Sequence, residues 1–157
     1  IECLERIPDA NVVTLVTPLR ERSALHDPSV VKAELTPWRS DIFQQELCSQ
    51  PEVWRAITFS RAPVPSARDW HDSLLDSNPP LFWQHVGVYA YRRSVLEKWD
   101  SLPESSLAEL ESLEQLRLIE AGIPIAAVRI NQTAQGIDTA ADYAVFVDRF
   151  RDQQEST

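Results

Sequence analysis

Apolar and polar side chains alternate most clearly over residues 84–92. One face carries Val86, Val88 and Ala90, and the other carries His85, Gly87, Tyr89 and Tyr91. A period of two, built from β-branched and aromatic residues, predicts a β-strand. We therefore expect a strand with one apolar face and one face rich in hydrogen-bonding groups.

Other apolar runs predict strands on both sides of this one. They cover residues 11–17, 29–35, 56–59 and 123–130. The first is continuously apolar and β-branched, which is typical of a strand buried on both faces. Pro124 stands near the start of the last run, where a missing N–H does least harm.

Helical spacing of apolar residues predicts short helices over residues 1–7, 20–26 and 93–99, and a last helix over 138–150. The longest predicted helix covers 106–121.

This long helix has signals at both of its ends. Ser106 and Glu109 fit a capping box, and Gly122 is suited to end the helix in a left-handed conformation. The predicted buried stripe consists of Leu107, Leu110, Leu113, Leu116 and Ile119.

Two further stretches read as loops. Residues 36–55 form a long insertion, for which a surface embellishment and a substrate lid are both open roles. Residues 67–81 are rich in Asp, Ser, Asn and Pro. The 157 residues as a whole are expected to form one domain.

The composition excludes several classes of protein. An apolar fraction of 43% and a charged fraction of 25% are ordinary for a globular protein, and a net charge of −9 argues against a nucleic-acid partner. No apolar run approaches the ~20 residues of a membrane span. With no signal peptide visible either, we expect a cytoplasmic location and no membrane partner.

Cysteine and glycine usage narrows the chemistry further. Cys3 and Cys48 show no metal-ligand or disulfide pattern, and they favour small buried thiols in a reducing compartment. The only glycines are Gly87, Gly122 and Gly136, too few and too far apart for a Gly-rich phosphate loop. Because the chain also lacks Met, we expect it to be a piece of a longer product.

Arg61 stands where a predicted strand ends and the Pro63–Pro65 segment begins. Proline fixes φ and keeps the residue before it extended, so this segment is expected to be rigid. A fixed guanidinium can bind a carboxylate through two parallel hydrogen bonds, whereas the alternative is a surface salt bridge in an acidic chain. Arg68 is a weaker candidate of the same type.

His85 and Tyr89 are predicted to point to the same face of their strand, with Gly87 leaving a gap between them. A ligand ring could enter that gap and bind the imidazole and the phenol. The alternative is a pair of core residues with one partner each, and Tyr91 can serve packing alone.

Polar side chains also mark the predicted long helix and the segment after the last strand. Glu111, Glu114 and Gln115 stand at i, i+3 and i+4 and are expected on one side of the helix. Glu114 and Gln115 can flank a pocket for vicinal hydroxyls or can be solvated, and solvation fits Glu111 better. Asp138 opens the last predicted helix, where a carboxylate is a typical cap.

These residues fall into four ordered motifs. They are Phe-Ser-Arg-Ala-Pro-Val-Pro at 59–65 followed by Arg68–Asp69, His-x-Gly-x-Tyr-x-Tyr at 85–91, Glu-x-Leu-Glu-Gln-Leu-Arg at 111–117, and Gly-Ile-Asp-Thr at 136–139 followed by Asp142. Together they resemble the 3-deoxy-manno-octulosonate (Kdo) cytidylyltransferases, or CMP-Kdo synthetases, from about Val30 to the C-terminus.

The resemblance implies an α/β fold, the later part of a Rossmann-like, nucleotide-diphospho-sugar transferase-like three-layer sheet with a dimerisation hairpin. It implies a homodimer that uses CTP, Mg²⁺ and a 2-keto sugar acid to form CMP-Kdo for lipopolysaccharide synthesis. The nucleotide-binding segment of that family is not found here, and the insertion at 36–55 replaces a short turn.

The resemblance also assigns roles to the candidate residues. The sugar-acid site would consist of Arg61, His85, Tyr89, Glu114 and Gln115. Arg61 and Asp138 would be catalytic, with Asp138 as one of two aspartates on Mg²⁺. A single carboxylate binds Mg²⁺ poorly, so no tight metal site is expected in this chain alone.

Two alternatives stay open. The protein could act on another sugar acid, such as amino-Kdo or a sialic acid, because the insertion departs from the family pattern. It could also be a dimerising remnant without turnover, which the missing phosphate loop favours.

Overall fold

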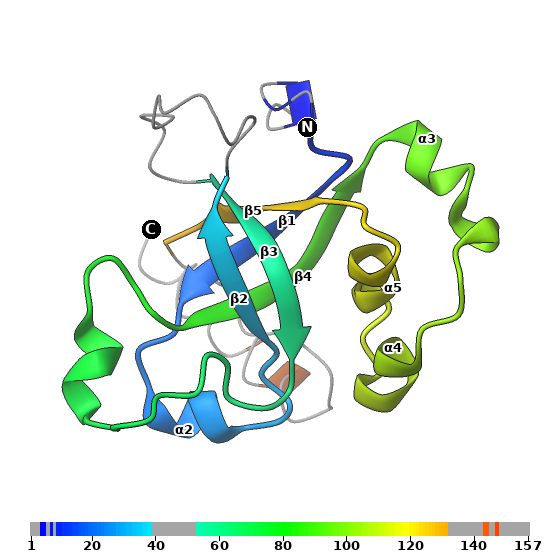
Figure 1. Cartoon of the computed structure of the whole chain (residues 1–157). Coiled ribbons are helices and arrows are strands. Elements are labelled where there is room, and N and C mark those ends of the chain that lie inside the picture. The colour runs from blue at the N-terminus through cyan, green and yellow to red at the C-terminus, as the bar shows by residue number, and fades with distance from the viewer. Residues whose placement is uncertain are drawn as a thin grey trace.

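The computed structural model describes residues 9–38 and 53–131, together with residues 4, 5, 7, 143, 144 and 147. Figure 1 shows the order of the elements. The strands are β1 (Val12–Pro18), β2 (Lys32–Pro37), β3 (Val53–Ser60), β4 (Trp83–Tyr91) and β5 (Ile125–Arg129). The α-helices are α2 (Arg22–His26), α3 (Arg93–Leu96), α4 (Ser106–Glu111) and α5 (Gln115–Glu120), and the 3-10 turns are η1 (Asp72–Asp76) and η2 (Trp99–Ser101).

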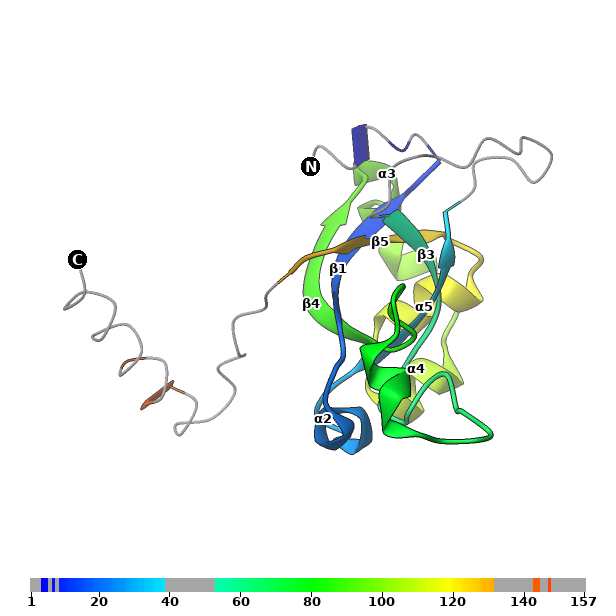
Figure 2. The same cartoon turned by 90° about the vertical axis from the view of Figure 1, so that its left-hand side faces the viewer.

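The five strands form one sheet that closes on itself in the order β1-β4-β2-β3-β5. β5 runs parallel to β1, whereas the other neighbouring pairs are antiparallel. Figures 1 and 2 show the curled sheet with α5 packed beside β3 and α4 next to it. The predicted α/β class is confirmed.

The strands form where the apolar pattern is strongest. β1 is buried along nearly its whole length, as expected for a strand covered on both faces. Its Val12 and Val16 pack in the main core with Phe59, Leu116 and Ile125. The core therefore lies between the sheet and the helices α4 and α5.

A bulge interrupts the pairing of β1 with β4. Thr14 pairs with Tyr89 and Leu15 with Val86, so that Gly87 and Val88 have no partner in β1. The Thr14 hydroxyl lies 3.2 Å from the carbonyl oxygen of Val86 and 3.0 Å from that of Val88. Thr14 thus supplies a hydrogen bond that the interrupted ladder cannot.

The predicted helix over 106–121 is wrong as one element, because Ser112 adopts a left-handed conformation with φ 51° and separates α4 from α5. Leu107 and Leu110 are 48% and 82% exposed, so the predicted stripe is buried only from Leu113 onward. The expected left-handed end is confirmed at Gly122, where φ is 72°.

The cap of α4 is Ser105, not the predicted Ser106. The Ser105 hydroxyl accepts a hydrogen bond of 2.9 Å from the N–H of Ala108, and Ser106 is exposed. We therefore expect Ser105→Ala to lower the free energy of unfolding by about 1 kcal/mol, the usual effect of losing such a cap. Urea denaturation measures this difference. Ser106→Ala is the matched control, and an equal loss in both variants would contradict the assignment.

The predicted insertion over residues 36–55 is partly strand. Residues 36–37 and 53–55 of the predicted insertion belong to β2 and β3, where Thr36 pairs with Arg55. Residues 39–52 of the insertion lie outside the described residues. The same is true of Asp138 and of both cysteines. All described helices are too short or too polar to traverse a lipid bilayer.

Candidate functional site

Arg61 follows directly after the end of β3, and its polar groups are held by backbone and side-chain partners. Its Nε donates to the carbonyl oxygen of Glu111 at 2.7 Å, and its Nη1 donates to that of Pro28 at 2.9 Å. Its backbone N–H donates to Glu111 Oε2 at 2.6 Å. The guanidinium is therefore fixed in place without a carboxylate partner among the described residues.

Glu111 does not lie on a solvated helix face, and that expectation is wrong. Its Oε1 accepts a hydrogen bond of 2.7 Å from the Ser60 hydroxyl while its Oε2 accepts the Arg61 N–H. The break at Ser112 also means that Glu111, Glu114 and Gln115 do not share one helix face. The sequence offered no signal for this contact, because its two sides are about fifty residues apart.

His85, Tyr89 and Tyr91 form a row of contacting aromatic rings with two residues from outside β4. The centroids of His85 and Tyr89 are 5.4 Å apart, and those of Tyr89 and Tyr91 are 5.7 Å apart. Phe59 lies 4.8 Å from His85, and Trp99 lies 5.9 Å from Tyr91.

The predicted gap between His85 and Tyr89 is therefore wrong, since the two rings contact each other. A Cβ at Gly87 would meet no atom within 4 Å, and Gly87 itself is exposed. The bulge at Gly87 and Val88 brings residues 85 and 89 closer than a regular strand would. A ligand would have to approach the edge of this aromatic row and not its interior.

His85 forms a hydrogen bond of 3.0 Å between its Nε2 and the Thr14 hydroxyl. That hydroxyl has one proton and two carbonyl oxygens in reach, so the geometry assigns the donated proton of this bond to His85 Nε2. Burial lowers the pKa of His85 to about 4. The ring is thus neutral near pH 7, with its Nδ1 as an acceptor.

Two polar groups near this row, the Tyr89 hydroxyl and the Gln115 amide, form no hydrogen bond with a described residue. The Tyr89 hydroxyl is buried, and no described atom meets the distance and angle of a hydrogen bond with it. Burial raises its pKa, whereas the nearby Thr14 side chain acts in the opposite direction. Gln115 is 8% exposed, and its amide forms no hydrogen bond with a described residue. Burial, followed by the nearby Glu114 carboxylate, raises the pKa of Tyr91.

The structure brings some of the predicted site residues together and leaves one out. His85 contacts Tyr89, Glu114 lies near Tyr91, and Arg61 is tied to α4 through Glu111. Asp138 lies outside the described residues. Within the described ranges no cluster of three His, Cys, Asp or Glu could hold a metal ion.

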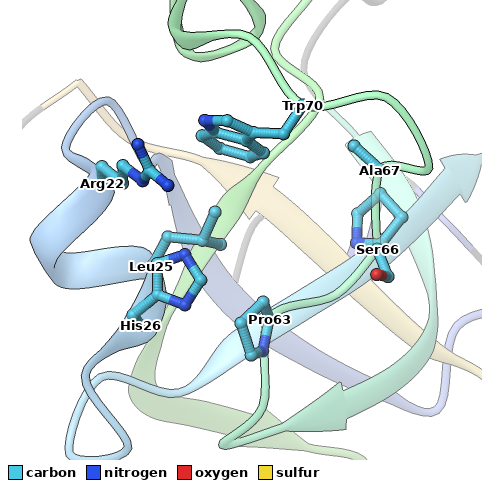
Figure 3. A pocket seen from close by; sticks show the side chains of 8 residues that line it. Arg22, Leu25, His26, Pro63, Ser66, Ala67 and Trp70 are labelled. Carbon is cyan, nitrogen blue, oxygen red and sulfur yellow. The ribbon is translucent and has the colours of Figure 1, made fainter.

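A groove of about 270 Å³ lies between α2 and the segment after Arg61, and its lining includes none of the predicted site residues. Figure 3 shows Arg22 and His26 of α2 across from Pro63, with Trp70 at one end. The Arg22 guanidinium stacks 5.4 Å from the Trp70 ring centroid and lies 3.5 Å from Asp72. Its cation is therefore already paired within the chain.

Comparison with known proteins gives consistent results. The family model described as Cytidylyltransferase matches residues 1–130. The 3-deoxy-manno-octulosonate cytidylyltransferase of Rhodopirellula baltica is 40% identical over 93% of this chain and 53% of the relative. The protein of the same name from Chloroherpeton thalassium is 36% identical over 88% of this chain and 54% of the relative.

A solved structure of CMP:2-keto-3-deoxy-manno-octonic acid synthetase complexed with CTP has a similar fold. It superposes with a TM-score of 0.73 at 31% identity, over 98% of this chain and 54% of that chain. The chain thus spans about half the length of the relatives it matches.

Proposed function

Because the chain belongs to the cytidylyltransferase family, we propose that the protein transfers the cytidylyl group of CTP to Kdo and releases pyrophosphate. In this proposal the described residues supply the sugar-acid part of the site. We assign the nucleotide part to the region of the relatives that this chain does not span, because the chain covers 53% of the Rhodopirellula baltica relative.

The observation that carries the proposal is the state of the Arg61 guanidinium. A guanidinium has five N–H donors, and here two of them, on Nε and Nη1, donate to carbonyl oxygens. The other three donate to no described residue, and no described carboxylate pairs with the charge. A rigid cation with free parallel donors suits the carboxylate of a 2-keto sugar acid.

Neighbouring groups fit the hydroxyls of such a substrate. The Tyr89 hydroxyl is buried without a described hydrogen-bond partner. The Gln115 side chain is 8% exposed, and its amide forms no hydrogen bond with a described residue. A buried polar group without a partner costs free energy, which a polyol would recover on binding. His85, Tyr89, Glu114 and Gln115 therefore remain our proposed sugar-acid ligands beside Arg61.

The proposed reaction is the one that the family relationship implies. The anomeric oxygen of the sugar acid attacks the α-phosphorus of CTP, its proton is released, and the bond from that phosphorus to the pyrophosphate oxygen breaks. Arg61 orients the sugar by its carboxylate, and such positioning supplies much of the acceleration. Asp138 is our proposed Mg²⁺ ligand. The described residues contain no cluster of three or more His, Cys, Asp or Glu that could hold a metal ion. The cation would neutralise charge on the phosphate oxygens.

We further propose a cytoplasmic homodimer. Leu107 and Leu110 of α4 expose apolar surface, and a second copy could cover it.

The open alternatives to this function are another sugar acid, such as amino-Kdo or a sialic acid, and a dimerising remnant without turnover.

Pyrophosphate release from CTP, Mg²⁺ and Kdo tests the proposal. The chain is assayed alone and in a chimera, in which it replaces the matching region of the Rhodopirellula baltica relative. We expect activity in the chimera and none in the chain alone. A properly folded chimera that fails with Kdo but works with amino-Kdo or a sialic acid would indicate the first alternative, and failure with every sugar acid would indicate the remnant.

A further inference from the structure

Lys32, the first residue of β2, is fully buried, with 0% of its surface exposed. Its Nζ donates to three carbonyl oxygens: those of Asp27 at 2.9 Å, Val30 at 2.6 Å and Arg61 at 2.5 Å. An ammonium has three donors, so these bonds use all of them. No described carboxylate lies within salt-bridge distance of it.

A buried ammonium is a costly choice for packing alone, because desolvation of its charge is unfavourable. That burial lowers the pKa of Lys32, while the nearby Asp27 and Glu111 carboxylates act in the opposite direction. An apolar residue of the same length would fill the space at lower cost. What it could not do is bind three carbonyl oxygens that come from two separate segments.

These carbonyls place Lys32 on one side of Arg61. One bond holds the Arg61 carbonyl directly. The other two hold the turn from Asp27 to Val30, and the Pro28 carbonyl of that turn accepts the Arg61 Nη1 proton. Lys32 therefore acts on both the backbone and the guanidinium of Arg61.

Glu111 holds Arg61 from the other side. Its carboxylate accepts the Arg61 backbone N–H, and its backbone carbonyl accepts the Nε proton. Together, Lys32 and Glu111 reach both backbone polar groups of Arg61 and, with Pro28, both of its bound guanidinium protons. Only the remaining protons on Nη1 and Nη2 lack a described acceptor.

We propose that Lys32 and Glu111 are positioning residues, which hold Arg61 so that its Nη1 and Nη2 protons face the carboxylate of the sugar acid. This inference rests on the proposed function for the identity of the ligand. The arrangement of the three residues stands on the hydrogen bonds alone.

Kinetics of the chimera test the inference. In Lys32→Met and Glu111→Gln we expect the KM for Kdo to rise about tenfold or more, since small displacements of a positioned group are costly. The KM for CTP should stay within about twofold, because a loss of contacts with one substrate changes only the kinetic constants for that substrate. Lys98→Met and Glu120→Gln, which alter exposed residues, are the matched controls.

A second readout keeps the inference testable if Lys32→Met fails to fold or if the chimera has no activity. The ¹⁵N NMR signal of Arg61 Nε–H should exchange slowly with water in the unmodified protein and faster in Glu111→Gln. Unchanged exchange in that variant, or an equal rise in the KM of both substrates, would overturn the positioning role. Absence of activity with the expected NMR change would count against the proposed function only.

Discussion

Arg61→Ala in the chimera is expected to lower kcat/KM for Kdo by about a hundredfold or more. Hydrogen bonds to a charged group contribute roughly 1.5–3 kcal/mol each, and the variant removes both the charge and its parallel donors. Initial rates of pyrophosphate release at varied Kdo and saturating CTP give this ratio. The loss should appear mainly in the kinetic constants for Kdo, since we assign Arg61 to the carboxylate of that substrate.

The control for this variant is Arg55→Ala. Arg55 is exposed on β3, the same strand that leads to Arg61, and its loss should leave the kinetics unchanged. Because Arg61 also donates to the carbonyls of Glu111 and Pro28, urea denaturation must accompany the kinetics. Equal rates in the two variants would contradict the role of Arg61.

Stability should fall as the pH is lowered from about 6.5 toward 4, because the folded protein keeps His85 neutral. The pKa of His85 is lowered from 6.5 to about 4 by burial, so below 6.5 the unfolded chain binds a proton that the folded chain does not. The contribution is fully present above pH 6.5 and is lost as the pH falls. It amounts to roughly 3 kcal/mol at most.

Urea denaturation at pH 7, 6, 5 and 4 measures this loss. His85→Gln should show a flatter profile over that interval, because glutamine does not titrate. His71→Gln removes an exposed histidine and should keep the profile of the unmodified protein. An NMR titration that places the pKa of His85 near 6.5 would contradict the buried, neutral assignment.

The strands could be predicted well because their signal is local. A continuously apolar β1 and the alternation in β4 depend only on neighbouring residues. The break between α4 and α5 depends instead on Ser112 and on the pairing of Glu111 with the end of β3. Helical periodicity cannot report a contact between segments so far apart in sequence.

The candidate site likewise combines residues that local sequence signals indicate with contacts between distant segments that they do not. The sequence pointed to Arg61, His85 and Tyr89, but it did not show that two carbonyls fix the guanidinium or that a bulge brings the two rings together. Lys32 was predicted only as part of a strand, and its burial depends on acceptors in two distant segments. Asp138 stays a prediction, since it lies outside the described residues.

The binding of the sugar-acid carboxylate by Arg61 is best tested with Kdo and its C1 methyl ester, which lacks the negative charge, in the chimera and in Arg61→Ala. We expect the unmodified chimera to prefer the acid by about a hundredfold and Arg61→Ala to lose most of this preference, because the carboxylate and the guanidinium are energetically coupled. An Arg61→Ala enzyme that retains the full preference for the acid would contradict this role of Arg61.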